Sequence, residues 1–285
     1  MQYLLLAIVF SSCVFVVMRL FERFHVDNHQ ALAWNYVVAA GVGFLMSGQV
    51  DTLPQLTDEP WFKLSLLTGF WFIFTYLLMT RSSQRSGVTV TSLSSKLSVV
   101  IPTTLGVVLF HEKLNFIATC GILLSIVALC LVVGKGKETG RKQAGWALPI
   151  VIFFGTGIGD MLMKFTERLN KSDDMTFMIA FIYLIAMLFG IAIVVYDLVK
   201  GKSKWQWKSA LGGLALGLVN FFSSYCMYYG MRLFDNTLIF PIYNIGVVRV
   251  TALIGLLFFK EKLTPKNFIG LVLAIIAVVL ITFKP

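Results

Sequence analysis

Charged residues are scarce in this sequence: Asp, Glu, Lys and Arg make up 13% of its 285 residues, whereas an ordinary globular domain has about 25%. Hydrophobic residues reach 58%, and the mean hydropathy is +0.82. Apolar runs long enough for one helix across a bilayer, which takes roughly 20 residues, follow one another along the chain. This composition excludes a soluble globular protein and predicts a polytopic integral membrane protein.

Several patterns that carry chemistry in other protein classes are also missing. No Cys-x-x-Cys pair occurs, and the four cysteines lie in apolar runs, so we predict small buried side chains rather than a metal or disulfide framework. His25 and His29 lie in a predicted loop without further ligands, so we reject a metal site there. No glycine-rich phosphate loop, nucleophile constellation or basic segment mixed with aromatics is present. We therefore expect no enzyme activity, no metal, no cofactor and no nucleic-acid partner.

What the sequence does contain is a series of apolar segments, separated by short gaps that hold the charges and the turn-forming residues. We expect ten transmembrane helices, over residues 3–21, 32–48, 62–80, 88–110, 116–134, 146–165, 176–196, 209–230, 237–259 and 268–283. The first segment lacks a basic region before it and a clear cleavage site, so we expect a retained helix rather than a signal peptide. No gap is long enough for a separate soluble domain.

The chain repeats itself. FHEKLN at 110–115 matches FKEKLT at 259–264 with a shift of 149 residues, and MRLFER at 18–23 matches MKFTER at 163–168 with a shift of 145. The chain therefore divides into two halves of five helices, and because five is odd, the second half must insert upside down relative to the first. We predict an all-α integral membrane fold of ten transmembrane helices arranged as two inverted five-helix repeats, a recurring plan of secondary transporters.

We place the first repeat at residues 1–134, a basic linker loop at 135–145 and the second repeat at 146–285. This plan, with an F-x-E-K-L-[NT] corner between the fourth and fifth helix of each half, resembles the drug/metabolite transporter superfamily, and most closely its EamA-type family. The resemblance covers essentially the whole chain. It implies that helices 1–4 and 6–9 surround a central cavity, that helices 5 and 10 pack outside it, and that the cargo is a small metabolite. Relatives that carry sugar phosphates similarly place basic residues in helices 4 and 9.

Apart from Lys63 at the very start of its span, five charged residues lie within the predicted spans: Arg19, Lys96, Asp160, Lys164 and Arg249. A charge at the bilayer centre costs about 2.5–3.5 kcal/mol on insertion scales, so such residues usually face a cavity or a partner. Arg19 and Lys164 lie near span ends, where they can snorkel to the interface, and Lys164 can alternatively pair with Asp160 one turn earlier. Lys96 and Arg249 lie near the middle of spans 4 and 9. We predict that they line the cavity; the alternative is that they only bond backbone carbonyls or Asp160.

Four bases against one acid leave the predicted membrane interior positively charged unless an anion visits it. A carboxylate or phosphate accepts charge-assisted hydrogen bonds from Lys and Arg, so we predict that Lys96 and Arg249 receive an acidic group of the substrate. Pro102 should loosen the helix that follows Lys96. Asp160 is a candidate for carrying a coupling proton, or it stays ionised as a partner of Lys164.

Further candidates for the substrate-binding wall share a polar or aromatic side chain within or near a predicted span: Arg19, Lys164, Asn35, Trp71, Tyr76, Asn220, Tyr225, Tyr243 and Asn244. For the aromatic members, simple packing is the alternative, because it is the commoner role of an aromatic side chain on a membrane helix.

Lysines and arginines are unevenly distributed between alternate loops. The loops after predicted spans 1, 3, 5, 7 and 9 contain fourteen of the 24, the opposite side contains six, and the spans hold four. The positive-inside rule therefore predicts that both termini lie outside the cell, whereas the resembling family usually has its termini inside.

Together these observations predict a secondary transporter, an exporter or exchanger. Its cargo would be a small polar metabolite that is anionic or zwitterionic, such as an amino acid, an organic acid or a sugar phosphate, bound near the midplane between the repeats. Two alternatives are an exporter of cationic drugs that uses Asp160, against which the buried bases argue, and an integral membrane protein without transport activity. We expect a multi-pass protein of the plasma (inner) membrane, a monomer or a weak homodimer in the lipid bilayer.

Overall fold

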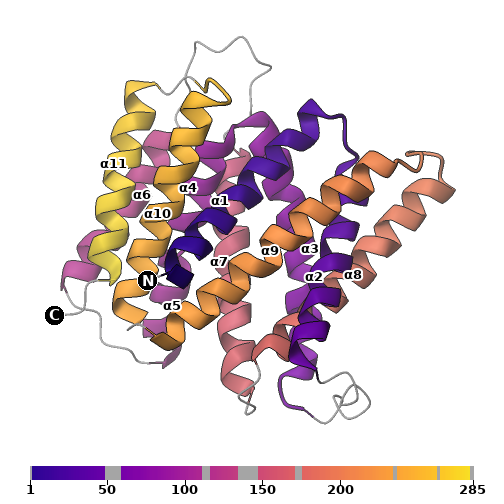
Figure 1. Cartoon of the computed structure of the whole chain (residues 1–285). Coiled ribbons are helices and arrows are strands. Elements are labelled where there is room, and N and C mark those ends of the chain that lie inside the picture. Colours follow the sequence, from indigo (N-terminus) through magenta and orange to yellow (C-terminus); the bar gives the residue numbers. More distant parts are fainter. Residues whose placement is uncertain are drawn as a thin grey trace.

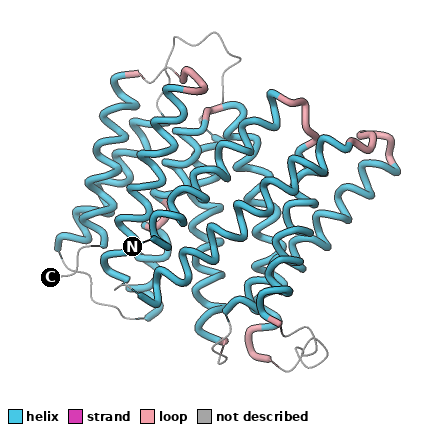
Figure 2. Tube along the Cα trace, in the orientation of Figure 1, coloured by secondary structure: helices cyan, strands magenta, loops and turns pink. Residues whose placement is uncertain are grey.

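The structure is a computed structural model that describes residues 2–48, 59–110, 116–133, 147–170, 175–233, 236–261 and 264–282. These residues form helices joined by short loops, with no strand among them (Figures 1 and 2). The helices in the described ranges are α1 Gln2–Arg23, α2 Asn28–Ser47, α3 Phe62–Arg85, α4 Val88–Leu97, α5 Val100–Phe110, α6 Phe116–Val133, α7 Ala147–Leu169, α8 Met175–Val199, α9 Trp207–Leu233, α10 Asn236–Leu257 and α11 Pro265–Thr282. Five of them, α1, α3, α7, α8 and α9, are long and apolar enough to cross a membrane.

One predicted span is broken in the structure. Residues 88–110 form α4 and α5, which are separated by a turn at Ser98 and Val99. Pro102 has no N–H to donate to the Ser98 carbonyl four residues earlier, and the N–H of Ile101 bonds to that carbonyl instead, at 2.9 Å. The expected loosening near Pro102 is therefore confirmed, and it amounts to a complete interruption of the helix rather than a kink.

Other helices begin and end where the sequence supplies caps. Asp27 precedes α2 and accepts a hydrogen bond from the Gln30 N–H at 3.0 Å. Thr264 precedes α11 and accepts one from the Asn267 N–H at 3.3 Å, with Pro265 as the first helical residue. The predicted cap at Thr264 is confirmed. The corresponding cap predicted at Asn115 lies outside the described residues.

The helices pack as two edges joined by crossing helices (Figure 1). At one edge α6 and α11 pack on each other beside α4 and α10, and at the opposite edge α2 packs on α8. Between them α1 lies against α9 and α10, and α3 lies against α7 and α8. The outer position of α6 and α11 agrees with the position that the family resemblance implies for helices 5 and 10.

The connections α1–α2, α3–α4 and α10–α11 lie at one end of the molecule, and α1 begins at the opposite end (Figure 1). The loops after spans 1, 3 and 9 thus share one end, as alternating spans require. The side of the membrane that this end faces stays a prediction.

Glycines allow α9 to approach α2 closely. Gly213 and Gly217 lie four residues apart on α9, in the small-xxx-small spacing that brings membrane helices together. A Cβ atom on Gly213 would lie 2.3 Å from the Ala31 carbonyl oxygen and 2.4 Å from Trp34 Cβ. A Cβ atom on Gly217 would lie 2.6 Å from the Asn35 carbonyl oxygen. These contacts involve backbone atoms, which cannot move aside without separating the helices.

We therefore expect Gly213→Ala to destabilise the protein by about 1–3 kcal/mol, because overpacking forces a backbone shift. Gly41→Ala is the matched control, since a Cβ atom there meets nothing within 4 Å and alanine favours a helix by up to about 1 kcal/mol. Thermal unfolding in detergent measures both variants. Equal melting temperatures for the two variants would contradict the close α2–α9 contact.

Candidate functional site

The break between α4 and α5 places a cation at a helix end inside the bundle. Lys96 lies in the last turn of α4, where a positive charge is favoured by the helix dipole and by the unpaired carbonyls of that turn. Its side chain is half-buried. The Lys96 Nζ atom lies 4.3 Å from the centroid of the Tyr243 ring on α10, which is a favourable cation–π distance. Lys96 is thus held between the end of α4 and the face of an aromatic ring.

Asp160 on α7 faces the same break. The Ser98 hydroxyl, in the turn after α4, lies 3.5 Å from an Asp160 carboxylate oxygen, and the Lys96 ammonium attracts this carboxylate electrostatically. Asp160 is exposed, as is Ile158 two residues earlier, and residues two apart on an α-helix point to opposite sides. Ile158 belongs to the outer apolar face, so the exposure of Asp160 is toward the interior, beside α4.

Tyr243 and Asn244 continue this group on α10. The Tyr243 hydroxyl donates to the Ser11 hydroxyl of α1 at 3.0 Å. Asn244 is buried and lines a small pocket beside Lys96 of about 10 Å³, together with Val248. This pocket holds no more than a water molecule, so a metabolite needs the surrounding helices to move apart before it can reach Lys96.

A second polar group connects α2, α3 and α9. The Tyr76 hydroxyl donates to Asn220 Oδ1 at 2.7 Å, and Asn220 Nδ2 donates to Asn35 Oδ1 at 3.2 Å. Asn35 and Asn220 are buried. Tyr76 also lies within electrostatic range of Asp160, so this chain of side chains leads from the α2–α9 contact toward the Lys96 group.

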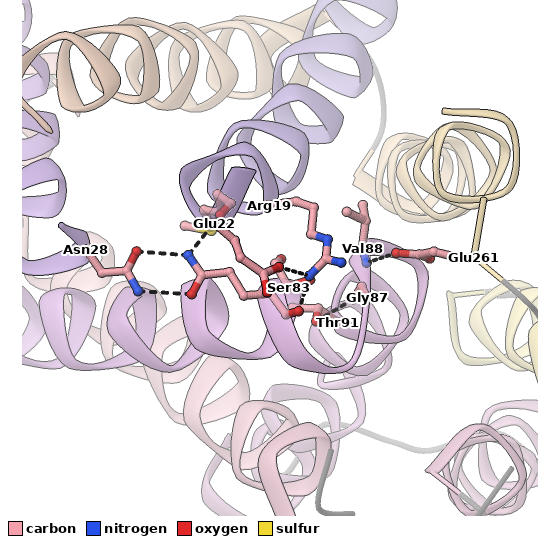
Figure 3. Close-up of polar contacts among 10 residues, drawn as sticks. Arg19, Glu22, Asn28, Ser83, Gly87, Val88, Thr91 and Glu261 are labelled. Carbon is pink, nitrogen blue, oxygen red and sulfur yellow. Dashed lines mark hydrogen bonds and ion pairs between the residues drawn. The ribbon is translucent and has the colours of Figure 1, made fainter. Parts of the chain in front are cut away.

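Arg19 bonds to other groups of the protein. The residue is 5% exposed. Its guanidinium lies 2.6 Å from a Glu22 carboxylate oxygen and donates to the Ser83 carbonyl at 3.2 Å (Figure 3). It also donates to the Gln84 carbonyl. These carbonyls belong to the last turn of α3, where a helix has no partners of its own. Arg19 therefore fixes the end of α3 to α1.

Arg249 lies on another face of α10. It is exposed and shares its helix face with Ile242 and Leu253, seven and four residues away, which are also exposed. Thr251, two residues on, points the opposite way and bonds to Ser92 of α4 at 2.7 Å. The structure does not bring Arg249 together with Lys96.

The remaining three candidates have other partners within the bundle. Trp71 Nε1 donates to the Gly155 carbonyl at 2.7 Å and joins α3 to α7. Tyr225 belongs to an aromatic series on α9, with its ring centroid 4.5 Å from that of Tyr229. Lys164 is half-buried on α7 and lies within electrostatic range of Glu167.

The sequence analysis did not select Ser11 or Ser98, which contact Tyr243 and Asp160. Ser98 had a usable signal, because it is the residue whose carbonyl Pro102 leaves without its helical partner. Serine is too common on membrane helices for Ser11 to have been selected by type alone.

The model of the EamA-like transporter family matches residues 1–134 and 141–283. An "Uncharacterized protein" of Haemophilus influenzae is 25% identical over 289 residues, which cover 98% of this chain and 96% of that protein. The "Uncharacterized transporter YxxF" of Bacillus subtilis is 27% identical over 158 residues, which cover 50% of this chain and 49% of that protein. A solved crystal structure matches with a TM-score of 0.60, 14% identity and 96% coverage of both chains, which is a likeness of fold alone.

Proposed function

Because the chain belongs to the EamA-like transporter family of the drug/metabolite transporter superfamily, and is a multi-pass membrane transporter of that type, we propose that it carries a small zwitterionic metabolite. We place the cargo between Lys96 and Asp160, at the break between α4 and α5. The observation that carries this proposal is the approach of one cation and one carboxylate on the inner faces of two different helices. An amino acid is the simplest cargo with both complementary charges.

The charges inside the bundle favour a zwitterion over a net anion. Arg19 is occupied by Glu22 and by the end of α3, and Arg249 faces the exposed side of α10. Lys164 lies within electrostatic range of the Glu167 carboxylate, so Lys96 and Asp160 remain as one charge of each sign. A carboxylate of the cargo would accept hydrogen bonds from Lys96, and its ammonium group would donate to Asp160.

We further propose that the two halves, 1–134 and 146–285 joined by the linker 135–145, are inverted repeats. Exchanging the halves replaces α1 by α7, α2 by α8, α3 by α9, α4 and α5 by α10, and α6 by α11. Under this exchange the α2–α8 and α6–α11 contacts map onto themselves, and the α1–α9 contact becomes the α7–α3 contact. Likewise α1–α10 becomes α7 against α4 and α5. A broken helix near the interface of such repeats is a common place for a transport site.

A thermal-shift screen of the purified protein tests the cargo class. Amino acids, organic acids, sugar phosphates and cationic dyes are compared, because a ligand that binds only the folded state stabilises it by RT ln(1 + [L]/Kd). We expect amino acids to raise the melting temperature, and we expect this rise to disappear in Lys96→Met. Stabilisation by organic acids or sugar phosphates alone would replace the zwitterion with an anion.

One alternative cargo has a specific observation in its favour. Asp160 is exposed on the inner face of α7, as the binding site of an exported cationic drug would require. Lys96, half-buried beside it, would repel such a cargo, so stabilisation by cationic dyes alone would favour this alternative. The same Asp160 side chain is the candidate for carrying a coupling proton.

We propose that the protein lies in the plasma (inner) membrane, as a monomer or a weak homodimer.

A further inference from the structure

Glu261 lies in the F-x-E-K-L corner between α10 and α11, yet its side chain reaches the start of α4. One carboxylate oxygen accepts a hydrogen bond from the Val88 N–H at 2.6 Å (Figure 3). The other accepts one from the Thr89 N–H at 3.2 Å. The first N–H groups of a helix have no partners within the helix, and the N-terminal end of its dipole attracts a negative charge. A residue of the second half of the chain thus caps a helix of the first half.

The backbone on both sides is shaped for this contact. Lys260, just before Glu261, has a φ of 49°, a left-handed conformation that residues other than glycine adopt rarely. The Glu261 N–H bonds to the Gly255 carbonyl at 2.9 Å, which fixes the corner to the end of α10. A Cβ atom on Gly87 or on Gly255 would lie 2.6 Å or 2.5 Å from a Glu261 carboxylate oxygen. The carboxylate therefore fills a space that exists because both positions are glycine.

The helix that Glu261 holds is a separate short segment. The turn at Ser86 and Gly87 precedes α4, and the break at Ser98 and Val99 follows it. Lys96 is eight residues beyond Val88, or about 12 Å along the helix axis at 1.5 Å per residue. The end of α4 near Glu261 is closed, since Ser82, Ser83 and Val88 are each 0% exposed. A movement of α4 at its start would therefore be transmitted to Lys96.

We propose that Glu261 is a latch and positioning residue: it holds α4 in place, keeps Lys96 at the cargo site, and closes this end of the transport pathway. The proposal rests on the proposed function in one respect, namely that α4 borders the pathway. Release of the Glu261 carboxylate from Val88 and Thr89 is then the step that opens this end. The corresponding Glu112 of the first F-x-E-K-L corner lies outside the described residues.

Water accessibility of buried cysteines tests the latch without any knowledge of the cargo. Ser82→Cys and Ser65→Cys are introduced singly into a protein whose four native cysteines are replaced by alanine. Both serines are 0% exposed on α3, but they lie at its opposite ends. The rate of reaction with a hydrophilic maleimide is measured in proteoliposomes for wild-type Glu261 and for Glu261→Gln. Glutamine keeps the size of the side chain and loses its charge and one acceptor.

We expect Glu261→Gln to accelerate labelling of Ser82→Cys by on the order of ten- to a hundredfold, the worth of hydrogen bonds to a charged group, and to leave Ser65→Cys unchanged. Gly255→Ala, which displaces the carboxylate while Glu261 is intact, should accelerate Ser82→Cys as well. Glu59→Gln removes an exposed carboxylate at the other end of α3 and should change neither rate.

An unchanged Ser82→Cys rate in Glu261→Gln overturns the latch, and so does equal acceleration of both cysteines, which indicates general loosening of the fold. The result is independent of the cargo site. Selective acceleration together with normal transport by Lys96→Met would uphold the latch and remove Lys96 from the site.

Discussion

Replacing Lys96 by methionine should abolish transport, or weaken cargo binding by on the order of a hundredfold, in a protein that still folds. Methionine has nearly the length of lysine but no charge, so the cargo carboxylate loses a charge-assisted hydrogen bond worth about 1.5–3 kcal/mol. Asp160→Asn should have a comparable effect through the opposite end of the cargo. Transport into proteoliposomes, with the compound found in the thermal-shift screen, measures both variants.

Arg249→Gln is the control for these two variants. The sequence predicted that Arg249 binds the cargo together with Lys96. In the structure, Arg249 is exposed on the face of α10 that carries Leu253. Removing its charge should leave transport close to that of the wild type. Normal transport by Lys96→Met, or loss of transport in Arg249→Gln, would contradict the proposed cargo site between Lys96 and Asp160.

Arg19→Met should have the largest effect on stability, about 1–3 kcal/mol for each buried carbonyl group that it leaves without a donor. The substitution leaves the carbonyls of Ser83 and Gln84 at the end of α3 without their donor, and leaves Glu22 without its ion pair. Lysine at position 19 should recover only part of the loss, since an ammonium group does not reproduce the planar fork of a guanidinium. The midpoint of unfolding in detergent gives the measurement.

The same Arg249→Gln variant serves as a comparison. It should not lower stability, because Arg249 is exposed and the substitution removes a charge from a membrane span. The assay also separates the two roles considered for Arg19. If Arg19→Met kept its stability and lost cargo binding, Arg19 would be a substrate ligand, as the sequence analysis had proposed, and the contact with α3 would be secondary.

The sequence predicted those features of the fold that are caused by residues close together in the chain. Apolar runs predicted the helices, Pro102 predicted the weakness of the fourth span, and Thr264 with Pro265 predicted the start of α11. Each of these follows from residues within one or two helical turns of one another. The break in the fourth span is also where we propose the cargo site, so the local signal of Pro102 lies beside the proposed site.

The grouping of the buried charges could not be predicted in the same way. Arg19, Lys96 and Arg249 look alike as basic residues in apolar spans, but their roles depend on how each helix is rotated in the bundle. Arg19 contacts the carbonyls of α3, Lys96 lies over the Tyr243 ring and attracts Asp160 electrostatically, and Arg249 is exposed. These rotations are fixed by contacts between residues distant in sequence, such as Gly213 with Ala31. The count of four bases against one acid therefore pointed to an anion, whereas the site that we propose holds one base and one acid.

The most direct measurement is the binding of three matched compounds to the wild type, Lys96→Met and Asp160→Asn. The compounds are the most stabilising amino acid of the screen, its N-acetyl derivative, which is an anion, and its methyl ester, which is a cation. The zwitterion should bind the wild type best. Lys96→Met should no longer prefer the amino acid over its ester, and Asp160→Asn should no longer prefer it over its N-acetyl derivative. Equal binding of the zwitterion and the N-acetyl derivative by the wild type would show that Asp160 does not receive the cargo, and would contradict the proposal.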